Sequence, residues 1–231
     1  MPPGGSVPVR GESTLPPGQR AAPLLPFGLP EFAGVRAQPV PGHMVTVGGA
    51  TRTPTQFRVD ELLALGTRRD QRSDLHCVTT WSSLRLSWAG VSFAEVHAEL
   101  TALVRPHPKA GWVRFTGLDG YRATMRLDDT LAADVLLADR LDGADLTDDH
   151  GAPLRLVAPA HYGYKSVKRL CAIDYLRDYD PGPAGWLGHP RGRVWREERG
   201  RYLPGRIWRG IWPGRIEQVR ALYRRDSGIA G

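Results

Sequence analysis

Proline and glycine are concentrated at the two ends of this chain, and this confines regular structure to its middle. Residues 1–42 contain ten prolines and seven glycines with almost no hydrophobic periodicity, so they should wrap over a surface or stay mobile. From Pro181 onward the chain is again rich in glycine, proline and arginine, with tryptophans between them. We therefore expect an irregular N-terminal arm over 1–42, a folded domain over 43–180 and an Arg/Trp-rich C-terminal extension over 181–231.

The stretch from Phe27 to Ala33 is an exception within the arm. It places two phenylalanines in a segment that otherwise lacks apolar side chains at regular spacing. Aromatic side chains gain much free energy from burial. We expect this stretch to anchor the arm on the body of the protein.

Between residues 43 and 180 the sequence alternates between strand-like and helix-like patterns. Asp60 can cap a first helix, and Ser92 with Glu95 forms a capping-box pair at the start of a second, which Pro106 ends. The expected strands are 44–49, 112–117, 121–127, 150–160 and 166–176, and the expected helices are 61–65, 93–104, 128–141 and 215–226. This mixture predicts an α+β fold with mixed sheets and short helices.

The net charge is +7 and the isoelectric point is near 9.8, a balance that can favour nucleic acid as a partner. However, only three of the 31 basic residues are lysines, and such a skew can also reflect coding bias. No apolar run approaches the roughly 20 residues that a membrane-spanning helix needs. The N-terminus also lacks the pattern of a secretory signal, so we expect a cytoplasmic protein without a membrane span.

Cys77 lies in the segment His76 to Ser82 and is open to three interpretations. A lone cysteine is most often a small buried hydrophobic residue. It could also be a nucleophile, with His76, His150 or His161 as its base. The third interpretation is a thiolate ligand to a metal whose other sulfur ligands come from a cofactor.

A second group of polar residues follows His161 in the segment 161–168. Gly163 permits close approach of backbone, while Lys165, Ser166 and Lys168 offer charge and hydrogen-bond donors suited to a phosphate. The spacing is not that of a P-loop, and a tight loop with solvated lysines is the simpler alternative. Two of the three lysines of the chain lie in this loop, and that clustering favours a functional site.

Taken together, these segments resemble the sulfite-oxidase family of molybdopterin-dependent oxidoreductases. The resemblance is stronger to catalytic subunits of bacterial protein-methionine-sulfoxide reductase than to sulfite oxidase proper. It is carried, in this order along the chain, by LHCVTTWS at 75–82, LDDTLAADVLLA at 127–138 and HGAPLRLVAPAHYGYKSVK at 150–168. The resemblance implies a sulfite-oxidase-type molybdopterin-binding domain and the cofactor molybdenum-molybdopterin (Mo-MPT).

The resemblance also assigns roles to single residues. Cys77 matches the one protein ligand to molybdenum, and metal coordination would keep that thiol deprotonated. The positions that match contacts to the pterin and its phosphate are Thr116, His150, Arg155, Ser166, Val167 and Lys168. His150 replaces an asparagine of the reductase relatives and can still donate a hydrogen bond.

The implied activity is two-electron oxygen-atom transfer on a small-molecule or protein-bound oxide, with electrons from an electron-transfer partner. Tyr121, His161 and Tyr162 are the candidates for proton donors or orienting groups beside the substrate, and a structural role is the alternative for each. Thr79, Thr80, Trp81 and Ser82 follow Cys77, where sulfite oxidase has an arginine. Hydroxyl and aromatic groups suit a neutral S-oxide or N-oxide better than the sulfite dianion.

Two alternatives remain open. Within the enzyme class, Arg85 or an arginine of the C-terminal extension could fold back and complete a sulfite dehydrogenase site. From a different class, the extension could make the protein a non-catalytic basic module that binds nucleic acid or an acidic partner. A binding module has no need for the ordered cysteine and lysine segments, so the sequence favours the enzyme.

Overall fold

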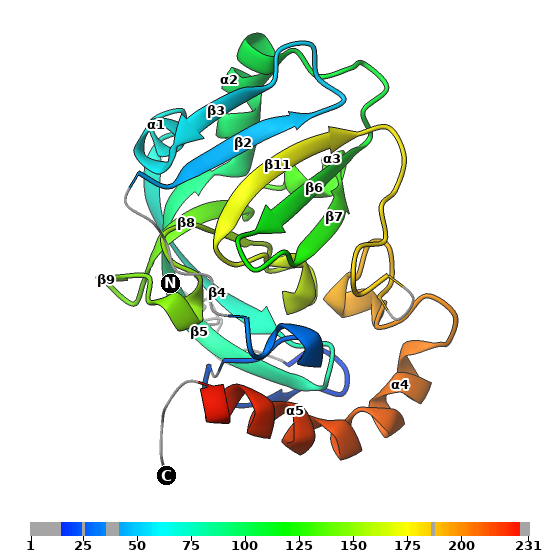
Figure 1. Cartoon of the computed structure of the whole chain (residues 1–231). Helices are drawn as coiled ribbons and strands as arrows, with labels where there is room; N and C mark the ends of the chain where they lie inside the picture. Colours follow the sequence, from blue (N-terminus) through cyan, green and yellow to red (C-terminus); the bar gives the residue numbers. More distant parts are fainter. Residues whose placement is uncertain (1–14, 25, 36–41, 186–187, 227–231) are drawn as a thin grey trace, which may run out of the picture.

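Two β-sheets form the body of the protein in the computed structural model (Figure 1), which describes residues 15–24, 26–35, 42–185 and 188–226. The larger sheet has the order β1-β5-β8-β10, with β4 paired to β5 and β9 paired to β8. The smaller has the order β3-β2-β11-β6-β7. Parallel pairing joins β1 to β5 and β2 to β11, and the other ladders are antiparallel. These mixed sheets confirm the expected fold class.

The smaller sheet follows the alternation of the sequence closely. Its strands are β2 (Met44–Gly49), β3 (Thr55–Arg58), β6 (Trp112–Gly117), β7 (Arg122–Arg126) and β11 (Leu170–Leu176). In β6 the residues alternate between buried and half-buried positions, as expected where one face of a strand meets a core. This sheet confirms four of the expected strands, although β11 begins at Leu170 rather than at 166.

The larger sheet is built on a long hairpin that the sequence patterns do not predict. β4 (Arg68–His76) pairs with β5 (Trp81–Ser92) along most of its length, through a bulge near Asp74. The other strands are β1 (Arg20–Ala21), β8 (Leu136–Leu141), β9 (Ala144–Asp145) and β10 (Arg155–Val157). β1 belongs to the N-terminal arm, so the arm continues the sheet beside the start of β5.

The helices are short. They are α1 (Val59–Leu63), α2 (Phe93–Val104), α3 (Leu127–Thr130), α4 (Gly205–Ile211) and α5 (Pro213–Asp226). Single 3-10 turns lie at Pro30–Phe32, Asp148–His150, Gly163–Lys165 and Val194–Arg196. α2 buries Phe93, Val96, Leu100 and Val104 in the main core, a spacing that puts all four on one helix face.

The expected helix over 128–141 is wrong. α3 ends at Thr130, and Leu136 to Leu141 instead form β8, which pairs with both β5 and β10. Leu136, Leu137 and Ala138 are fully buried, so this run is apolar on both faces of a central strand. A short apolar run of this kind fits a buried helix or a buried strand equally well, and here the sheet pairing decides.

The capping predictions for the first two helices also need correction. Ser92 precedes α2, but its side chain makes no capping bond. Glu95, the other member of the expected pair, accepts a hydrogen bond from the backbone N–H of Thr67 at 2.6 Å. Asp60 lies inside the first turn of α1, and Glu61 accepts from the backbone N–H of Arg58 at 2.8 Å. The helix beginnings are therefore tied to neighbouring chain in ways the local pattern does not show.

The arm anchors where the sequence predicts. Phe27 packs edge-on against Trp81 with ring centroids 5.7 Å apart, and Phe32 packs edge-on against Tyr121 at 5.4 Å. At the other end of the chain, α5 lies beside the arm (Figure 1), and the Tyr223 hydroxyl donates to the Leu29 carbonyl at 3.0 Å. The two ends of the chain therefore meet on the same side of the body.

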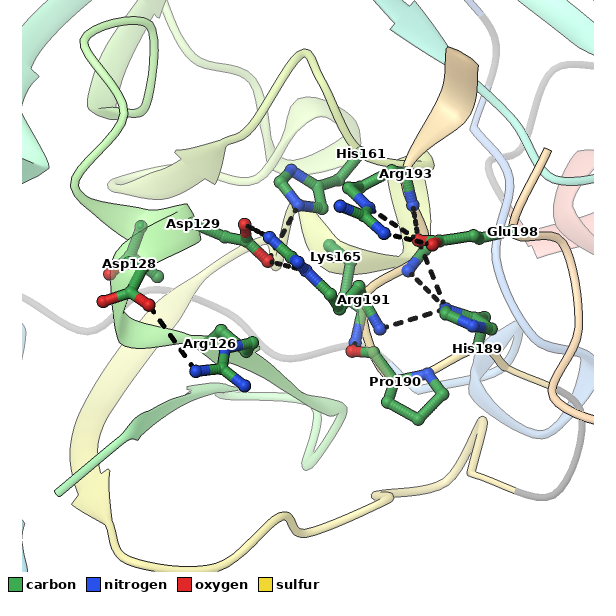
Figure 2. A network of polar contacts seen from close by, with 12 residues as sticks. Arg126, Asp128, Asp129, His161, Lys165, His189, Pro190, Arg191, Arg193 and Glu198 are labelled. Atoms are coloured by element: carbon green, nitrogen blue, oxygen red, sulfur yellow. Dashed lines mark hydrogen bonds and ion pairs between the residues drawn. The ribbon is translucent and has the colours of Figure 1, made fainter. Parts of the chain in front are cut away.

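A network of ion pairs holds the start of the C-terminal extension against the domain (Figure 2). Asp129 of α3 accepts hydrogen bonds from Arg191, with Nε to Oδ2 at 2.8 Å, and lies 3.6 Å from Nε2 of His161. Burial disfavours the charged carboxylate, but the His161 and Arg191 contacts outweigh burial and hold the pKa of Asp129 well below its usual range. Within the extension, Glu198 accepts from Arg193 and lies 3.3 Å from His189.

In the described part of the chain, no helix combines the length and the hydropathy needed to cross a membrane.

We predict that Asp129→Asn loosens the extension. The substitution leaves Arg191 and His161 without a charged partner, so the free energy of unfolding should fall by about 3 kcal/mol. Tryptic cleavage between residues 191 and 209 should become faster. The carboxylate contributes while it is charged, so the difference from wild type should shrink below about pH 4. Urea denaturation and limited proteolysis measure both effects.

Asp128→Asn is the matched control, because Asp128 is adjacent but its side chain is 80% exposed. Equal effects of the two substitutions would contradict a specific role for Asp129.

Candidate active site

Cys77 occupies the turn between the two longest strands of the larger sheet. The Cys77 N–H donates to the Trp81 carbonyl at 2.8 Å, and the Thr80 N–H donates back to the Cys77 carbonyl at 3.2 Å. Thr80 has φ of 80°, which is uncommon for a β-branched residue. Backbone strain of this kind persists where the surroundings impose it and is common at functional sites.

Two side chains from distant parts of the sequence hold this turn. Gln19 of the arm donates from Nε2 to the Cys77 carbonyl at 3.0 Å. Arg199 of the extension donates from Nη1 to the Val78 carbonyl at 2.7 Å and from Nη2 to the Pro17 carbonyl at 2.9 Å. The guanidinium is buried and lies over the Tyr162 ring, 5.1 Å from its centroid. Consecutive carbonyls of the cysteine turn are thus fixed by the two ends of the chain.

The thiol belongs to a half-buried residue and has a polar neighbour. Burial raises the pKa of Cys77, while the Thr79 hydroxyl, 3.1 Å from Sγ, and the charges of Arg199 and Arg220 act in the opposite direction. Both cysteines, Cys77 and Cys171, are free. Without a metal, Cys77 is held as a neutral thiol, which argues against an activated nucleophile.

Cys77 lines a cavity of about 550 Å³, which is within the range of small-molecule sites. The walls come from the cysteine turn, the loops at 147–151 and 163–169, the arm and α5. The cavity therefore lies where the domain, the N-terminal arm and the C-terminal extension meet.

Part of the cavity lining carries the cationic side chains of Arg155 and Lys168, which we call the cationic end. Arg155 is buried and donates to the carbonyls of His150 at 2.8 Å and Ser166 at 3.3 Å. Lys168 donates from Nζ to the Asp149 carbonyl at 2.7 Å. No ion pair joins either side chain to a carboxylate among the described residues. Gly151, at φ of 102°, lets its loop lie against Lys168, since a Cβ there would come within 2.9 Å of the lysine Cβ.

Burial lowers the pKa of both cations, to about 10 for Arg155 and, with the charges of Arg155 and Arg169 adding to it, to about 7 for Lys168. Burial also lowers the pKa of His150, and the charges of Lys168 and Arg155 lower it further. Asp149 and Asp119 act against the shift at Lys168 but do not offset it, and buried positive charge is unfavourable unless it is paired. This end of the cavity is therefore suited to an anionic group such as a phosphate.

Four aromatic side chains also line the cavity, namely Phe27, Trp81, Trp212 and Tyr223, which we call the aromatic wall. Phe27 is central to it, packing against Trp81 and lying at 17° to the Tyr223 ring with centroids 6.4 Å apart. Hydroxyl groups near the wall come from Thr79 and Tyr121.

The structure brings most of the predicted site residues to this cavity. Its lining includes Cys77, Tyr121, His150, Arg155, Ser166, Val167 and Lys168. Thr116 lies in β6, outside this lining. His161 and Tyr162 also lie outside it, because His161 faces Asp129 and Tyr162 lies beneath Arg199. The roles predicted for these three residues have no geometric support here.

Tyr121 lines the cavity, but its hydroxyl hydrogen already takes part in a hydrogen bond. Its hydroxyl donates to the Tyr164 carbonyl at 2.6 Å, and burial raises its pKa well above the ordinary value. Lys165, from the same lysine pair as Lys168, turns away and donates to the carbonyls of Thr124 at 2.6 Å and Pro190 at 2.8 Å. Tyr121 therefore orients a group better than it gives up a proton.

The residues that sequence reasoning missed are Gln19, Arg199, Trp212 and Tyr223. All four come from the Gly/Pro-rich ends of the chain, where no motif spacing marks them, although Tyr223 lies in the expected helix over 215–226. Tryptophans in the extension were the one available signal, and only the tertiary structure shows which of them reaches the cavity.

Comparison with known proteins gives a family. A model described as the oxidoreductase molybdopterin binding domain matches residues 33–184. The protein named uncharacterized oxidoreductase YuiH of Bacillus subtilis is 38% identical over 133 residues, covering 57% of this chain and 65% of YuiH. The catalytic subunit MsrP of protein-methionine-sulfoxide reductase from Xanthomonas axonopodis is 30% identical over 214 residues, covering 78% of this chain.

A solved structure supports the fold. The sulfane dehydrogenase SoxCD from Paracoccus pantotrophus matches with a TM-score of 0.54 at 18% identity, over 68% of this chain and 46% of that chain. This chain spans 65% of the length of both YuiH and MsrP. The division of the chain at residues 42 and 180 stays a prediction.

We predict that Arg199→Met lowers the stability of the protein and makes the thiol of Cys77 more accessible. Two carbonyls lose their donors, so the free energy of unfolding should fall by about 2–4 kcal/mol. In cofactor-free protein, iodoacetamide should alkylate Cys77 several times faster, as followed by peptide mass mapping with Cys171 as internal reference.

The control is Arg196→Met, since Arg196 is exposed in the neighbouring 3-10 turn. Wild-type alkylation of Cys77 in the Arg199 variant would show that Arg199 does not hold the turn.

Proposed function

The chain belongs to the family of oxidoreductase molybdopterin-binding domains, and on that premise we propose that it reduces a neutral S-oxide or N-oxide. The observation that carries the proposal is the cavity, which joins Cys77, the cationic side chains of Arg155 and Lys168 and the aromatic wall. The resemblance to MsrP subunits supports the direction of the reaction. A cytoplasmic location is part of the proposal and rests on sequence alone.

The residues of the cavity fit the cofactor of this family. Arg155 and Lys168 would hold the anionic phosphate, whose charge would offset the burial that lowers their pKa values. Ser166 and His150 would add hydrogen bonds to the pterin. Cys77 would supply the thiolate ligand. The described residues contain no cluster of three or more metal-binding side chains, so the remaining ligands would have to come from the cofactor.

When bound, the cofactor supplies two-electron oxygen-atom transfer. The chain supplies a fixed cysteine, because Gln19 and Arg199 hold the two carbonyls of its turn. It also supplies a partly closed, aromatic cavity that limits access of water. Reduction of an S-oxide to a thioether and water consumes two protons and two electrons, so an electron-transfer partner must provide the electrons.

The groups around Cys77 favour a neutral substrate. Thr79 and Trp81 line the cavity beside it, whereas Thr80 and Ser82 are buried outside the lining. Arg85 is exposed and does not line the cavity. Arg199 is bound to backbone carbonyls, so its donors are not directed at a substrate. Hydroxyl and indole donors suit a single oxide oxygen better than a dianion.

Sulfite oxidation is a second candidate, supported by one observation. The charges of Arg199 and Arg220 act on the Cys77 thiol, so arginines of the extension do approach the cysteine. Arg220 is paired with Glu217, with Nη1 to Oε1 at 3.3 Å. A sulfite site would require this pair to open.

The non-catalytic binding module has less support. Arginines 191, 193 and 209 of the extension make ion pairs with carboxylates of the same chain, and Arg199 is buried. Much of the basic charge is therefore engaged in holding the extension to the domain rather than presented to nucleic acid.

We predict that molybdenum-loaded protein reduces a sulfoxide with an artificial electron donor faster than it oxidises sulfite with an artificial acceptor. The physical reason is the absence of paired cationic donors on the cavity lining next to Cys77. Steady-state kinetics with methyl phenyl sulfoxide and with sulfite test this. Efficient sulfite oxidation that is lost in Arg220→Met would establish the second candidate instead.

Cys77→Ser is the control for the assignment of the ligand. The variant should keep its fold, which circular dichroism would follow, and lose both turnover and thiolate-to-metal absorption. Full activity in this variant would contradict the ligand assignment.

We predict that Arg155→Met and Lys168→Met reduce the amount of pterin that stays bound after purification. A buried charge-assisted contact contributes up to about 3 kcal/mol, so occupancy at limiting cofactor should fall severalfold. The measurement is pterin fluorescence and molybdenum content per chain.

Lys109→Met is the control, because Lys109 is exposed and remote from the cavity lining. Unchanged occupancy with a raised KM for the substrate would move Arg155 and Lys168 from the cofactor site to the substrate site.

A further inference from the structure

The aromatic wall comes mainly from outside the part of the chain that matches the family. The family model covers residues 33–184, which includes Trp81 but not Phe27, Trp212 or Tyr223. The cationic end lies wholly inside the matched part. The cavity therefore combines residues inside the range of the family model with residues of the terminal segments outside that range.

The terminal segments are fitted to one another at this wall. Tyr223 donates to the Leu29 carbonyl at 3.0 Å and stacks on Phe27. A Cβ at Gly28 would clash with the Tyr223 hydroxyl, so the arm passes beneath α5 with little space to spare. These contacts indicate that the arm and α5 pack specifically against each other at the wall.

Two hydrogen-bond donors of the wall lack acceptors. The indole N–H groups of Trp81 and Trp212 are buried, and neither has a hydrogen-bond partner among the described residues. The indole N–H groups of Trp88 and Trp208 also lack partners, but these residues do not line the cavity. Only the Trp81 and Trp212 donors belong to residues of the lining, where a ligand could supply the acceptor that buried donors normally have. An oxide oxygen is an acceptor that could satisfy such a donor.

We propose that the aromatic wall is the substrate-specificity subsite, and that it selects an S-oxide carrying an apolar or aromatic substituent. The substituent packs against Phe27, Trp212 and Tyr223, and the oxide oxygen accepts from the indole N–H of Trp81, which lies in the cysteine turn. This rests on the proposed function and names its substrate class. It also assigns α5 of the extension a direct part in recognition.

Physical chemistry separates this class from its competitors. Burial of an aryl group against aromatic rings is favourable by about 25 cal/mol per Å² of apolar area removed from water, with a further gain from ring geometry. Dimethyl sulfoxide has the same oxide oxygen but little apolar area. Sulfite is a dianion without an apolar substituent, and the four side chains of the wall are aromatic and carry no positive charge.

The test compares methyl phenyl sulfoxide with dimethyl sulfoxide in wild type, Tyr223→Ala and Trp212→Ala. Both variants should raise the KM for methyl phenyl sulfoxide about tenfold, with less than twofold change for dimethyl sulfoxide and with unchanged molybdenum content. Tyr202→Ala and Trp195→Ala are matched controls, because these aromatic residues of the extension are 72% and 60% exposed.

Equilibrium binding provides a readout that does not depend on turnover. Methyl phenyl sulfide, the product thioether, should bind molybdenum-loaded protein by isothermal titration calorimetry, and its Kd should rise about tenfold in the two wall variants. Failure of wild type to reduce any sulfoxide, with this binding intact, would refute the proposed function and leave the subsite standing.

Three outcomes would overturn the subsite. One is an equal loss for both sulfoxides in the wall variants. Another is a fall in molybdenum and pterin content with unchanged KM, which would make the wall part of the cofactor site. The third is wild-type binding of methyl phenyl sulfide in both variants.

Discussion

The candidate site depends on how the turn after β4 is held. A hairpin turn with a left-handed threonine is not rigid by itself, and its carbonyls at Cys77 and Val78 need donors once they are buried. Gln19 and Arg199 supply them from opposite ends of the chain. Because Arg199 also binds the Pro17 carbonyl, one buried guanidinium joins arm, turn and extension. The position of the thiol is consequently a property of the tertiary structure and not of the hairpin alone.

The charge distribution explains how so basic an extension can fold onto the domain. Residues 181–231 contain eleven arginines and four acidic residues, a net charge of +7, while residues 1–180 contain twenty of each sign. The whole net charge of the protein is therefore in the extension. Asp129 and Glu198 each take an arginine and face a histidine (Figure 2), and these partly buried contacts are screened less by salt than exposed ones.

What could be predicted from the sequence follows from the range of the interactions involved. The smaller sheet, α2 and the anchoring of Phe27 and Phe32 depend on local alternation or on large apolar side chains, and these expectations were confirmed. β8 was missed because its identity is decided by pairing with β5 and β10. The cavity residues that lie in the family-like segments were predicted, because those segments follow one another in a recognisable order. Arg199 and Tyr223 were not predicted, because their hydrogen bonds join residues 121 and 194 positions apart in the sequence.

The cationic end is suited to an anion and the aromatic wall to an apolar group, and the two come mostly from different parts of the chain. At the cationic end, Arg155 at the start of β10 donates to the His150 carbonyl and Lys168 donates to the Asp149 carbonyl. The Arg169 N–H donates to the Gly151 carbonyl, so the two loops are also joined through their backbones. The aromatic wall depends on contacts between terminal segments, chiefly Phe27 with Tyr223. Replacing side chains in the terminal segments can therefore alter the shape of the wall while leaving the anion-binding loops in place. A single domain that holds one cofactor can in this way present different surfaces to different substrates.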